Sequence, residues 1–133
     1  MRAFKLQVVT PDGEAYNGEA ESLLIRTSEG DIEFLAGHID FVASVGTGRA
    51  RIKADGADRF ASVSRGIVTV KGGEVTLAAV TFEFSENIDV ERAQRAKEAA
   101  EEKIKKSNDE RTMKLAKAKL ERAISRIKAA ELK

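Results

Sequence analysis

The chain has 133 residues, of which 34% are charged and 42% hydrophobic, and it contains no cysteine. The lack of cysteine excludes a disulfide framework and a thiolate metal site. No apolar run approaches the roughly 20 residues that cross a bilayer, so we expect no direct membrane insertion.

Charge and composition change together near Phe84. Residues 1–83 carry 9 Lys and Arg against 12 Asp and Glu, whereas residues 84–133 carry 14 against 10. All glycines, all aromatic residues and the one proline lie at or before Phe84. We therefore expect a β domain over residues 1–84 and an α-helical domain over residues 85–133.

The first domain shows short strand patterns separated by turn residues. Phe4, Leu6 and Val8 alternate with polar residues and predict a half-buried strand that ends at the turn Pro11–Gly13. Further strands are expected over 22–27, 31–35, 48–54, 59–64, 67–71 and 74–82, with hairpin turns at 55–56 and 72–73 and a corner at 65–66. Many short strands at this spacing predict an antiparallel β-sandwich.

The segment Ala36–Val42 does not alternate and is expected to be an ordered loop. Its apolar residues Ile39, Phe41 and Val42 either pack into the sandwich, which we favour, or face a partner. His38 is the only histidine, and we interpret it as a polar loop or interface residue rather than a metal ligand. A Ser-His-Asp triad is not supported, because the sequence contains no Gly-x-Ser-x-Gly motif. We therefore do not expect an enzyme.

The second domain reads as two helices. Asp89 is a natural N-cap for a helix over about 89–106, and Asp109 is one for a helix over about 110–131. The three residues Ser107–Asp109 are too short a connection for anything but antiparallel packing. Apolar residues follow a helical period at positions 93, 96, 100 and 104, and again at 113, 116, 120, 123, 127 and 130. Because most of them are alanine, we expect a weakly stabilised, antiparallel helical hairpin.

The second helix also carries a basic face. Arg122 and Arg126 are one turn apart and can bind phosphate oxygens or acidic side chains, although the pattern alone favours a solvated basic face. Nucleic acid is not an expected partner, because many cations of this domain are paired with anions at helical spacing.

Four motifs occur in a characteristic order. They are Val8–Gly13, Gly30–Val42, Ser64–Gly66 followed by Val75–Leu77, and Ile88–Ala93. Together they resemble the epsilon subunits of bacterial F-type ATP synthases over the whole chain. Ala36 and Asp40 stand where that family usually has proline, and Glu33 and Arg65 where it usually has glycine.

The resemblance implies a non-catalytic subunit of the central stalk, peripheral on the cytoplasmic face of the bacterial cell membrane. It implies contacts with the gamma subunit and the polar loops of the c-ring through Asp31, His38, Ile39, Asp40 and Phe41. It also implies that the helices can extend towards the alpha and beta subunits and inhibit ATP hydrolysis. In that form the acidic tips of the beta subunits would be contacted by Arg111, Lys114, Lys119 and Arg122.

The resemblance implies no obligatory cofactor. In some bacterial members of the family, a regulatory ATP binds the folded-down form. By position its site comprises Glu83, Ile88, Asp89, Arg92, Ala93, Arg122 and Arg126, and Ala99 stands where nucleotide-binding members have a further arginine. The alternative hypothesis is a β-sandwich protein-binding module that homodimerises through its helices.

Overall fold

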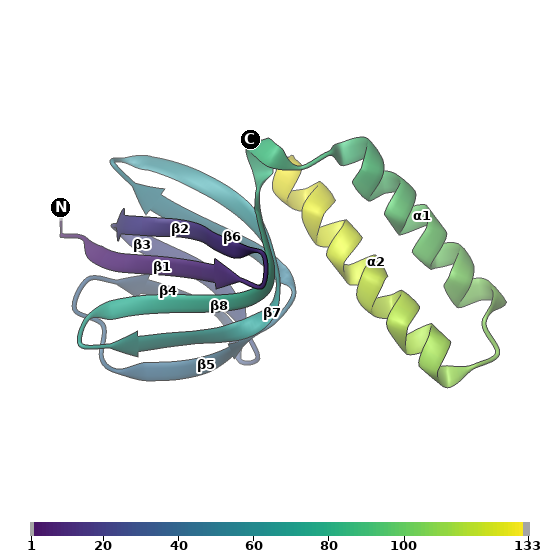
Figure 1. The fold of residues 1–133 in the computed structure, drawn as a ribbon, viewed down its shortest axis with the longest axis horizontal. Coiled ribbons are helices and arrows are strands. Elements are labelled where there is room, and N and C mark those ends of the chain that lie inside the picture. Colours follow the sequence, from purple (N-terminus) through teal and green to yellow (C-terminus); the bar gives the residue numbers. More distant parts are fainter. Residues whose placement is uncertain (1, 132–133) are drawn as a thin grey trace.

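A computed structural model describes residues 2–131, and Met1, Leu132 and Lys133 lie outside the described residues. Eight strands form a β-sandwich, and two helices form a hairpin at one end of it (Figure 1). The strands are β1 (Phe4–Thr10), β2 (Gly13–Ala20), β3 (Ser22–Thr27), β4 (Gly30–Leu35), β5 (Phe41–Val45), β6 (Gly48–Ala54), β7 (Ala57–Lys71) and β8 (Glu74–Phe84). The helices are the short 3-10 helix η1 (Ser85–Asn87), α1 (Val90–Lys106) and α2 (Glu110–Ala130). The predicted fold class, a sandwich followed by a helical hairpin, is confirmed.

Strand β7 organises the sandwich. The strands follow the order β2-β1-β8-β7-β5-β3-β4, and β6 pairs with β3 and β7. The first half of β7 pairs with β6 and its second half with β5, so the strand passes from one layer to the other. The pairs are antiparallel, as expected, except for β1 and β8, which are parallel. The core contains fully buried side chains from both layers, among them Leu6, Leu23, Ile25, Phe34, Ile52, Val68 and Leu77.

The predicted corner at 65–66 is not a hairpin. Both residues lie inside the continuous strand β7, at the point where it changes its partner. A Cβ on Gly66 would lie 2.0 Å from the Ala78 carbonyl oxygen of β8. The glycine therefore permits a close approach of two strand backbones rather than a turn.

Two further differences concern β2 and β5. The sequence of β2, GEAYNGEA, has no apolar alternation, and its strand character comes from pairing with β1 at the sheet edge. Strand β5 begins at Phe41, inside the segment expected to be a loop. Phe41 packs against the core, but Ile39 and Val42 are 75% and 69% exposed, so the favoured prediction that all three pack inside was wrong.

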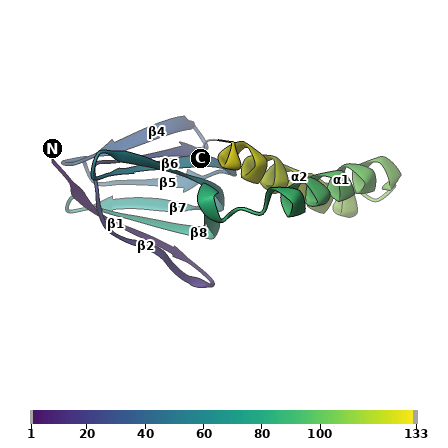
Figure 2. The same cartoon turned by 90° about the horizontal axis from the view of Figure 1, so that it is seen from above.

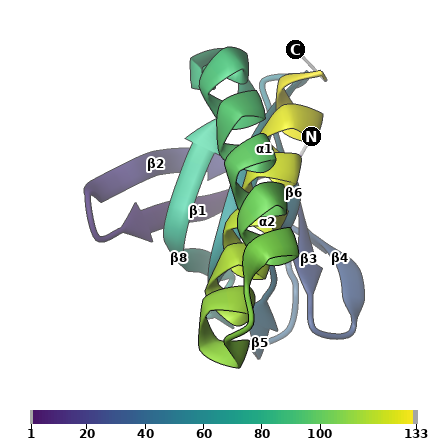
Figure 3. The ribbon, with the colours of Figure 1, turned by 90° about the vertical axis from the view of Figure 1, so that its right-hand side faces the viewer.

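The two helices begin where the caps predict. Asp89 accepts a hydrogen bond from the Arg92 amide at 3.1 Å, and Asp109 accepts one from the Arg111 amide at 3.2 Å. The helices lie antiparallel, with α2 between α1 and the sandwich (Figures 2 and 3). Their contact surface buries Ala93, Ala100, Ala116, Ala123 and Ala130, as expected of the alanine-rich seam. Ala96, also predicted to lie in the seam, is exposed instead.

Candidate functional site

The chain leaves the sandwich through a well-fixed segment. The Arg59 guanidinium lies over the Phe84 ring, 3.6 Å from its centroid, and also pairs with Glu86. Ser85 is buried, and the Ile88 amide donates to the Ser85 carbonyl oxygen at 3.2 Å. The end of β8 and η1 therefore hold the start of α1 close to the sandwich.

Four contacts join α2 to the sandwich and to the segment that follows it. The Ser125 hydroxyl lies 2.9 Å from the Ser62 hydroxyl of β7 and donates to the Gly48 carbonyl oxygen, also at 2.9 Å. Arg126 Nε lies 2.6 Å from Glu83 Oε1 of β8. Ile88 packs with Ala129 and Ala130 in a small apolar cluster. Only the last two turns of α2 are attached in this way, so the hairpin rests on the sandwich through a short stretch of helix.

A cleft opens where the sandwich, the start of α1 and α2 meet. We call it the junction cleft, and its volume is about 540 Å³. Its walls come from the end of β1, the turn between β1 and β2, strand β8, η1 and both helices. The lining residues are Thr10, Asp12, Gly13, Glu14, Ala15, Thr81, Phe82, Glu83, Asn87, Ile88, Asp89, Arg92, Ala93 and Arg126. Drug-sized ligands occupy clefts of roughly 300–1,000 Å³, so the junction cleft is large enough for a nucleotide.

Six of the seven residues expected to bind ATP line the junction cleft: Glu83, Ile88, Asp89, Arg92, Ala93 and Arg126. The seventh, Arg122, lines a neighbouring groove of about 280 Å³ between α1 and α2, and Arg126 belongs to both spaces. We call this second space the interhelical groove. Its other lining residues are Ala96, Ala99, Ala100, Lys103 and Lys119. The expected ATP residues therefore line two spaces that have Arg126 in common.

The charged residues that line the two spaces differ in sign. The junction cleft carries four carboxylates, from Asp12, Glu14, Glu83 and Asp89, and the two guanidinium groups of Arg92 and Arg126. The interhelical groove is lined by four cations, from Lys103, Lys119, Arg122 and Arg126, and by no carboxylate. A ligand with hydrogen-bond donors at one end and a polyanionic group at the other matches this division.

Some of these residues were not expected from the sequence. Asp12 and Glu14 reach the junction cleft because β1 pairs in parallel with β8, which places the β1–β2 turn beside Glu83. Lys103 joins the groove because the helices are antiparallel. Local sequence motifs do not indicate these three residues, because each reaches its site through contacts between segments that are distant in the sequence.

The residues expected at the gamma subunit and c-ring do not all lie together. His38, Ile39, Asp40 and Phe41 form one group in and after the β4–β5 connection. Asp31 lies at the start of β4, pairs with Arg26 at 3.3 Å, and lines a cleft beside α2. Asp31 is therefore separated from the other four by the length of β4.

His38 lies in a small cluster of aromatic rings. The centroid of its imidazole ring lies 4.9 Å from that of the Phe34 ring and 5.7 Å from that of the Phe41 ring. His38 Nδ1 lies 2.8 Å from the Ile39 carbonyl oxygen and can donate to it. Asp40 accepts a hydrogen bond from the Gly72 amide at 3.0 Å, which ties the connection to the β7–β8 turn. Leu35, Ile39 and Val42, which are near this group in the sequence, are exposed.

The residues expected to face acidic partners lie along α2. Arg111 and Lys114 are exposed in its first turns, and Lys119 and Arg122 line the interhelical groove. Within residues 2–131, no cluster of three or more His, Asp or Glu side chains could hold a metal ion. No helix in the same range combines the length and apolar character needed to cross a membrane.

Comparison with known proteins gives matches over both parts of the chain. Residues 3–85 match the family model described as ATP synthase, Delta/Epsilon chain, beta-sandwich domain, and residues 86–131 match the long alpha-helix domain of the same chain. A protein named ATP synthase epsilon chain from Bacillus velezensis is 38% identical over 130 residues, covering 98% of each chain. Another of that name from Ruminococcus albus is 39% identical over 134 residues, covering 100% of each.

Solved structures agree in fold. A chain in the Euglena gracilis mitochondrial ATP synthase, OSCP/F1/c-ring, superimposes with a TM-score of 0.83 at 26% identity, covering 98% of this chain and 82% of that one. A chain in the Tetrahymena thermophila mitochondrial ATP synthase central stalk and c-ring gives a TM-score of 0.61 at 13% identity, which reports on the fold alone.

Proposed function

Because this chain belongs to the ATP synthase delta/epsilon family, we propose that it is the epsilon subunit of an F-type ATP synthase, a non-catalytic part of its central stalk. In this role the sandwich binds the gamma subunit and the c-ring, and the hairpin regulates ATP hydrolysis. The assembly would hold the chain at the cytoplasmic face of the cell membrane.

Two surfaces of the sandwich suit two stalk partners. Val42 of β5, Ile67 of β7 and Val80 of β8 are 69%, 51% and 59% exposed. Strand register places them on one outer face. Val42 pairs with Thr69, which is two residues from Ile67 in β7, and Ile67 pairs with Ala78, which is two residues from Val80 in β8. Paired residues, and residues two apart in a strand, lie on the same face of a sheet. We assign this apolar face to gamma, since large exposed apolar groups mark protein interfaces. The group of His38, Ile39 and Asp40, at the end away from the hairpin, is assigned to the polar loops of the c-ring (Figure 1).

The hairpin is proposed to be a regulatory arm that ATP holds against the sandwich. The single observation that carries this proposal is that Arg126 lines both the junction cleft and the interhelical groove. The ribose hydroxyls and the adenine amino group would donate to carboxylates such as Glu83. The phosphates would lie along Arg122 and Arg126, with Lys103 and Lys119 nearby. The charge of these lysines offsets the loss of the arginine that Ala99 replaces.

ATP would compete with an ion pair that already holds α2. Arg126 pairs with Glu83, and both side chains are about one-third exposed. An exposed pair of this kind contributes only about 0.5–1 kcal/mol, so a phosphate group can replace Glu83 as the partner of Arg126 at small cost. A ligand present at 100 times its dissociation constant stabilises the state that binds it by about 2.7 kcal/mol. ATP would therefore favour the docked hairpin, and loss of ATP would favour its release.

Isothermal titration of the full chain with Mg-ATP tests this regulatory role. Wild type should bind, and Arg122→Ala and Arg126→Ala should each bind at least about tenfold more weakly, as expected from losing a charge-assisted phosphate contact. Arg95→Ala is the control, since Arg95 is an exposed α1 residue that lines neither space. Equal affinity of wild type and both variants would rule out the proposed ATP site.

A further inference from the structure

A second cleft lies on another face of α2. It has a volume of about 460 Å³ and is bounded by α2 on one side and by β3, β6 and β7 on the other. We call it the α2–β6 cleft. Helix α2 contributes Glu121, Ile124, Ser125 and Lys128, none of which lines the junction cleft or the interhelical groove. The proposed function leaves this cleft without a role.

The α2–β6 cleft combines an apolar surface with a cationic rim. Leu24, Phe60 and Ile124 supply aliphatic and aromatic surface. Four cationic residues, Arg26, Arg49, Arg51 and Lys128, line it together with only two carboxylates, Asp31 and Glu121. The resulting positive balance favours an anionic ligand that also has an apolar part.

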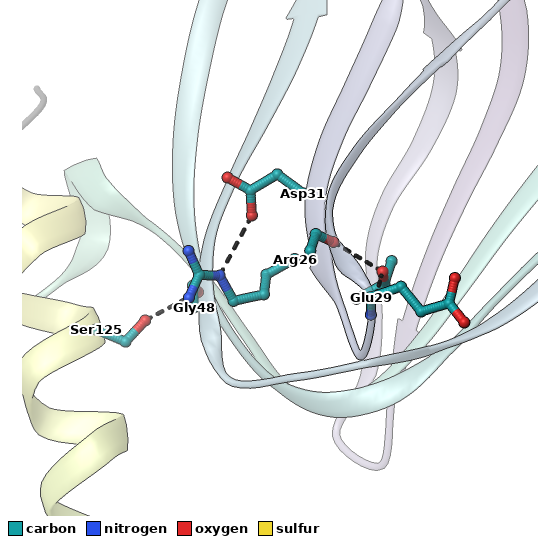
Figure 4. Close-up of polar contacts among 7 residues, drawn as sticks. Arg26, Glu29, Asp31, Gly48 and Ser125 are labelled. Atoms are coloured by element: carbon teal, nitrogen blue, oxygen red, sulfur yellow. Dashed lines mark hydrogen bonds and ion pairs between the residues drawn. The ribbon is translucent and has the colours of Figure 1, made fainter.

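Of the four cationic residues that line the cleft, two form ion pairs with carboxylates and two do not. Arg26 is held by Asp31 at 3.3 Å and packs over Gly48, whose carbonyl oxygen accepts from Ser125 (Figure 4). Arg51 pairs with Glu33 outside the cleft. Across residues 2–131, neither Arg49 nor Lys128 forms an ion pair. These two are therefore the cations most available to a ligand.

The hydrogen bonding of Arg51 is incomplete within the protein. Its buried Nε has no hydrogen-bond partner, although Nη2 of the same side chain contacts Ser22 and Glu33. A buried donor without an acceptor is unfavourable and uncommon in folded proteins.

We propose that the α2–β6 cleft binds a small organic phosphate. Its phosphate would contact Arg49 and Lys128, and its ring would pack against Phe60 and Ile124. Inorganic phosphate alone would leave most of the 460 Å³ unfilled, which favours a ligand with a ring or chain attached.

Such a ligand would also act on the position of the hairpin. Arg49 belongs to β6, whereas Ile124 and Lys128 belong to α2, so a bound phosphate bridges the two parts of the molecule. A ligand that binds only the docked form reduces the undocked population about 100-fold at 100 times its dissociation constant. The α2–β6 cleft is thus a second place, separate from the ATP site, from which a metabolite can hold the hairpin closed.

The probe is phenyl phosphate, titrated into the full-length chain and followed by amide chemical shifts. Saturable shifts in β6 and the last two turns of α2 are expected, with at least tenfold weaker binding by Arg49→Ala and Lys128→Ala. The matched controls are Arg65→Ala, in β7, and Lys117→Ala, in α2, because both side chains are exposed and line no cleft described above. Both should bind as wild type does.

Three results would overturn the proposal. One is the absence of saturable binding, and another is equal affinity of wild type, Arg49→Ala and Lys128→Ala. The third is loss of binding in Arg122→Ala with no change in Arg49→Ala, which would place the probe in the ATP site instead. Inorganic phosphate, titrated in parallel, should bind at least tenfold more weakly than phenyl phosphate. Equal affinities would show that the ring does not pack against Phe60 and Ile124, and would overturn the assignment of an organic ligand. None of these results depends on whether ATP binds the junction cleft.

Discussion

Ser125 of α2 and Ser62 of β7 are both buried, and their hydroxyl oxygens lie 2.9 Å apart. Ser125 donates its one proton to the Gly48 carbonyl oxygen, so Ser62 must donate to Ser125. The two serines therefore form a directional chain of hydrogen bonds that ends on the β6 backbone. This chain is the buried polar contact between the hairpin and the sandwich.

We predict that Ser125→Ala weakens hairpin docking more than Ser62→Ala does. Loss of the Ser125 hydroxyl removes the hydrogen bonds to both Ser62 and the Gly48 carbonyl oxygen, and a buried polar group left unsatisfied costs about 1–3 kcal/mol. Ser62→Ala leaves the Ser125 to Gly48 hydrogen bond intact. Hydrogen exchange should be at least about tenfold faster in the α2 amides of Ser125→Ala, with little change in β1 and β8. Equal effects of the two variants would contradict this assignment of donors.

The Arg126–Glu83 ion pair is expected to contribute little by itself. Both side chains are about one-third exposed, and pairs of this kind usually couple by about 0.5–1 kcal/mol. A double-mutant cycle with Arg126→Ala and Glu83→Gln, measured by urea denaturation, should give a coupling free energy in this range. The coupling should also decrease in 1 M salt. A coupling above about 2 kcal/mol would mean that the pair, rather than a ligand, fixes the hairpin.

Gly66 is predicted to be essential for the packing of β7 on β8. An added Cβ would lie 2.0 Å from the Ala78 carbonyl oxygen and 2.8 Å from Ala79 Cα, and no rotamer can relieve a clash with backbone. Gly66→Ala should reduce the free energy of unfolding by about 2 kcal/mol or more. Gly18→Ala, in β2, is the control, because its Cβ would meet only Tyr16 side-chain atoms at 3.6 Å or more. Similar urea midpoints for the two variants would contradict the prediction.

Features that depend on neighbouring residues could be predicted from the sequence, whereas features that depend on distant strands could not. Asp89 and Asp109 were identified as helix caps because a cap needs only its own side chain and the next turn. Strand β2 was missed because its residues carry no alternation and become a strand only by pairing with β1. Gly66 was misread as a turn for the same reason: its role depends on Ala78, twelve residues later.

The candidate site likewise combines residues from one local motif with residues that only the fold brings together. Asp89, Arg92 and Ala93 follow from a motif within one helical turn, whereas the contribution of Asp12 depends on the parallel pairing of β1 with β8. The α2–β6 cleft could not be predicted, because Arg49 and Lys128 are 79 positions apart and meet only through the docking of α2.

The start of α2 should weaken at acidic pH. The Thr112 hydroxyl and the Arg111 amide donate to the Asp109 carboxylate and hold its pKa below the ordinary value. A carboxyl whose pKa is lowered by folding stabilises the folded state above its unfolded pKa, about 3.9, and this stabilisation is lost as the pH falls further. Exchange of the Arg111 amide should therefore show an added acceleration below about pH 4. Asp109→Asn should retain a cap and lose this pH dependence, and an unchanged pH profile in that variant would contradict the prediction.

The outer face formed by Val42, Ile67 and Val80 is predicted to bind the gamma subunit. Burial of each such side chain is worth about 1.5–3 kcal/mol, and a carboxylate in its place would have to be desolvated without a partner. Val42→Asp and Ile67→Asp should each reduce capture of co-expressed gamma at least about tenfold while leaving the fold intact, because both native side chains are more than half exposed.

Leu115→Asp is the control for this surface, since Leu115 is 58% exposed but lies on α2. It should bind gamma through the sandwich as wild type does. Sedimentation of the isolated chain completes the measurement, because the same apolar face could instead join two copies. A stable dimer that Val42→Asp dissociates, together with unchanged gamma capture by both sandwich variants, would assign this face to self-association rather than to the central stalk.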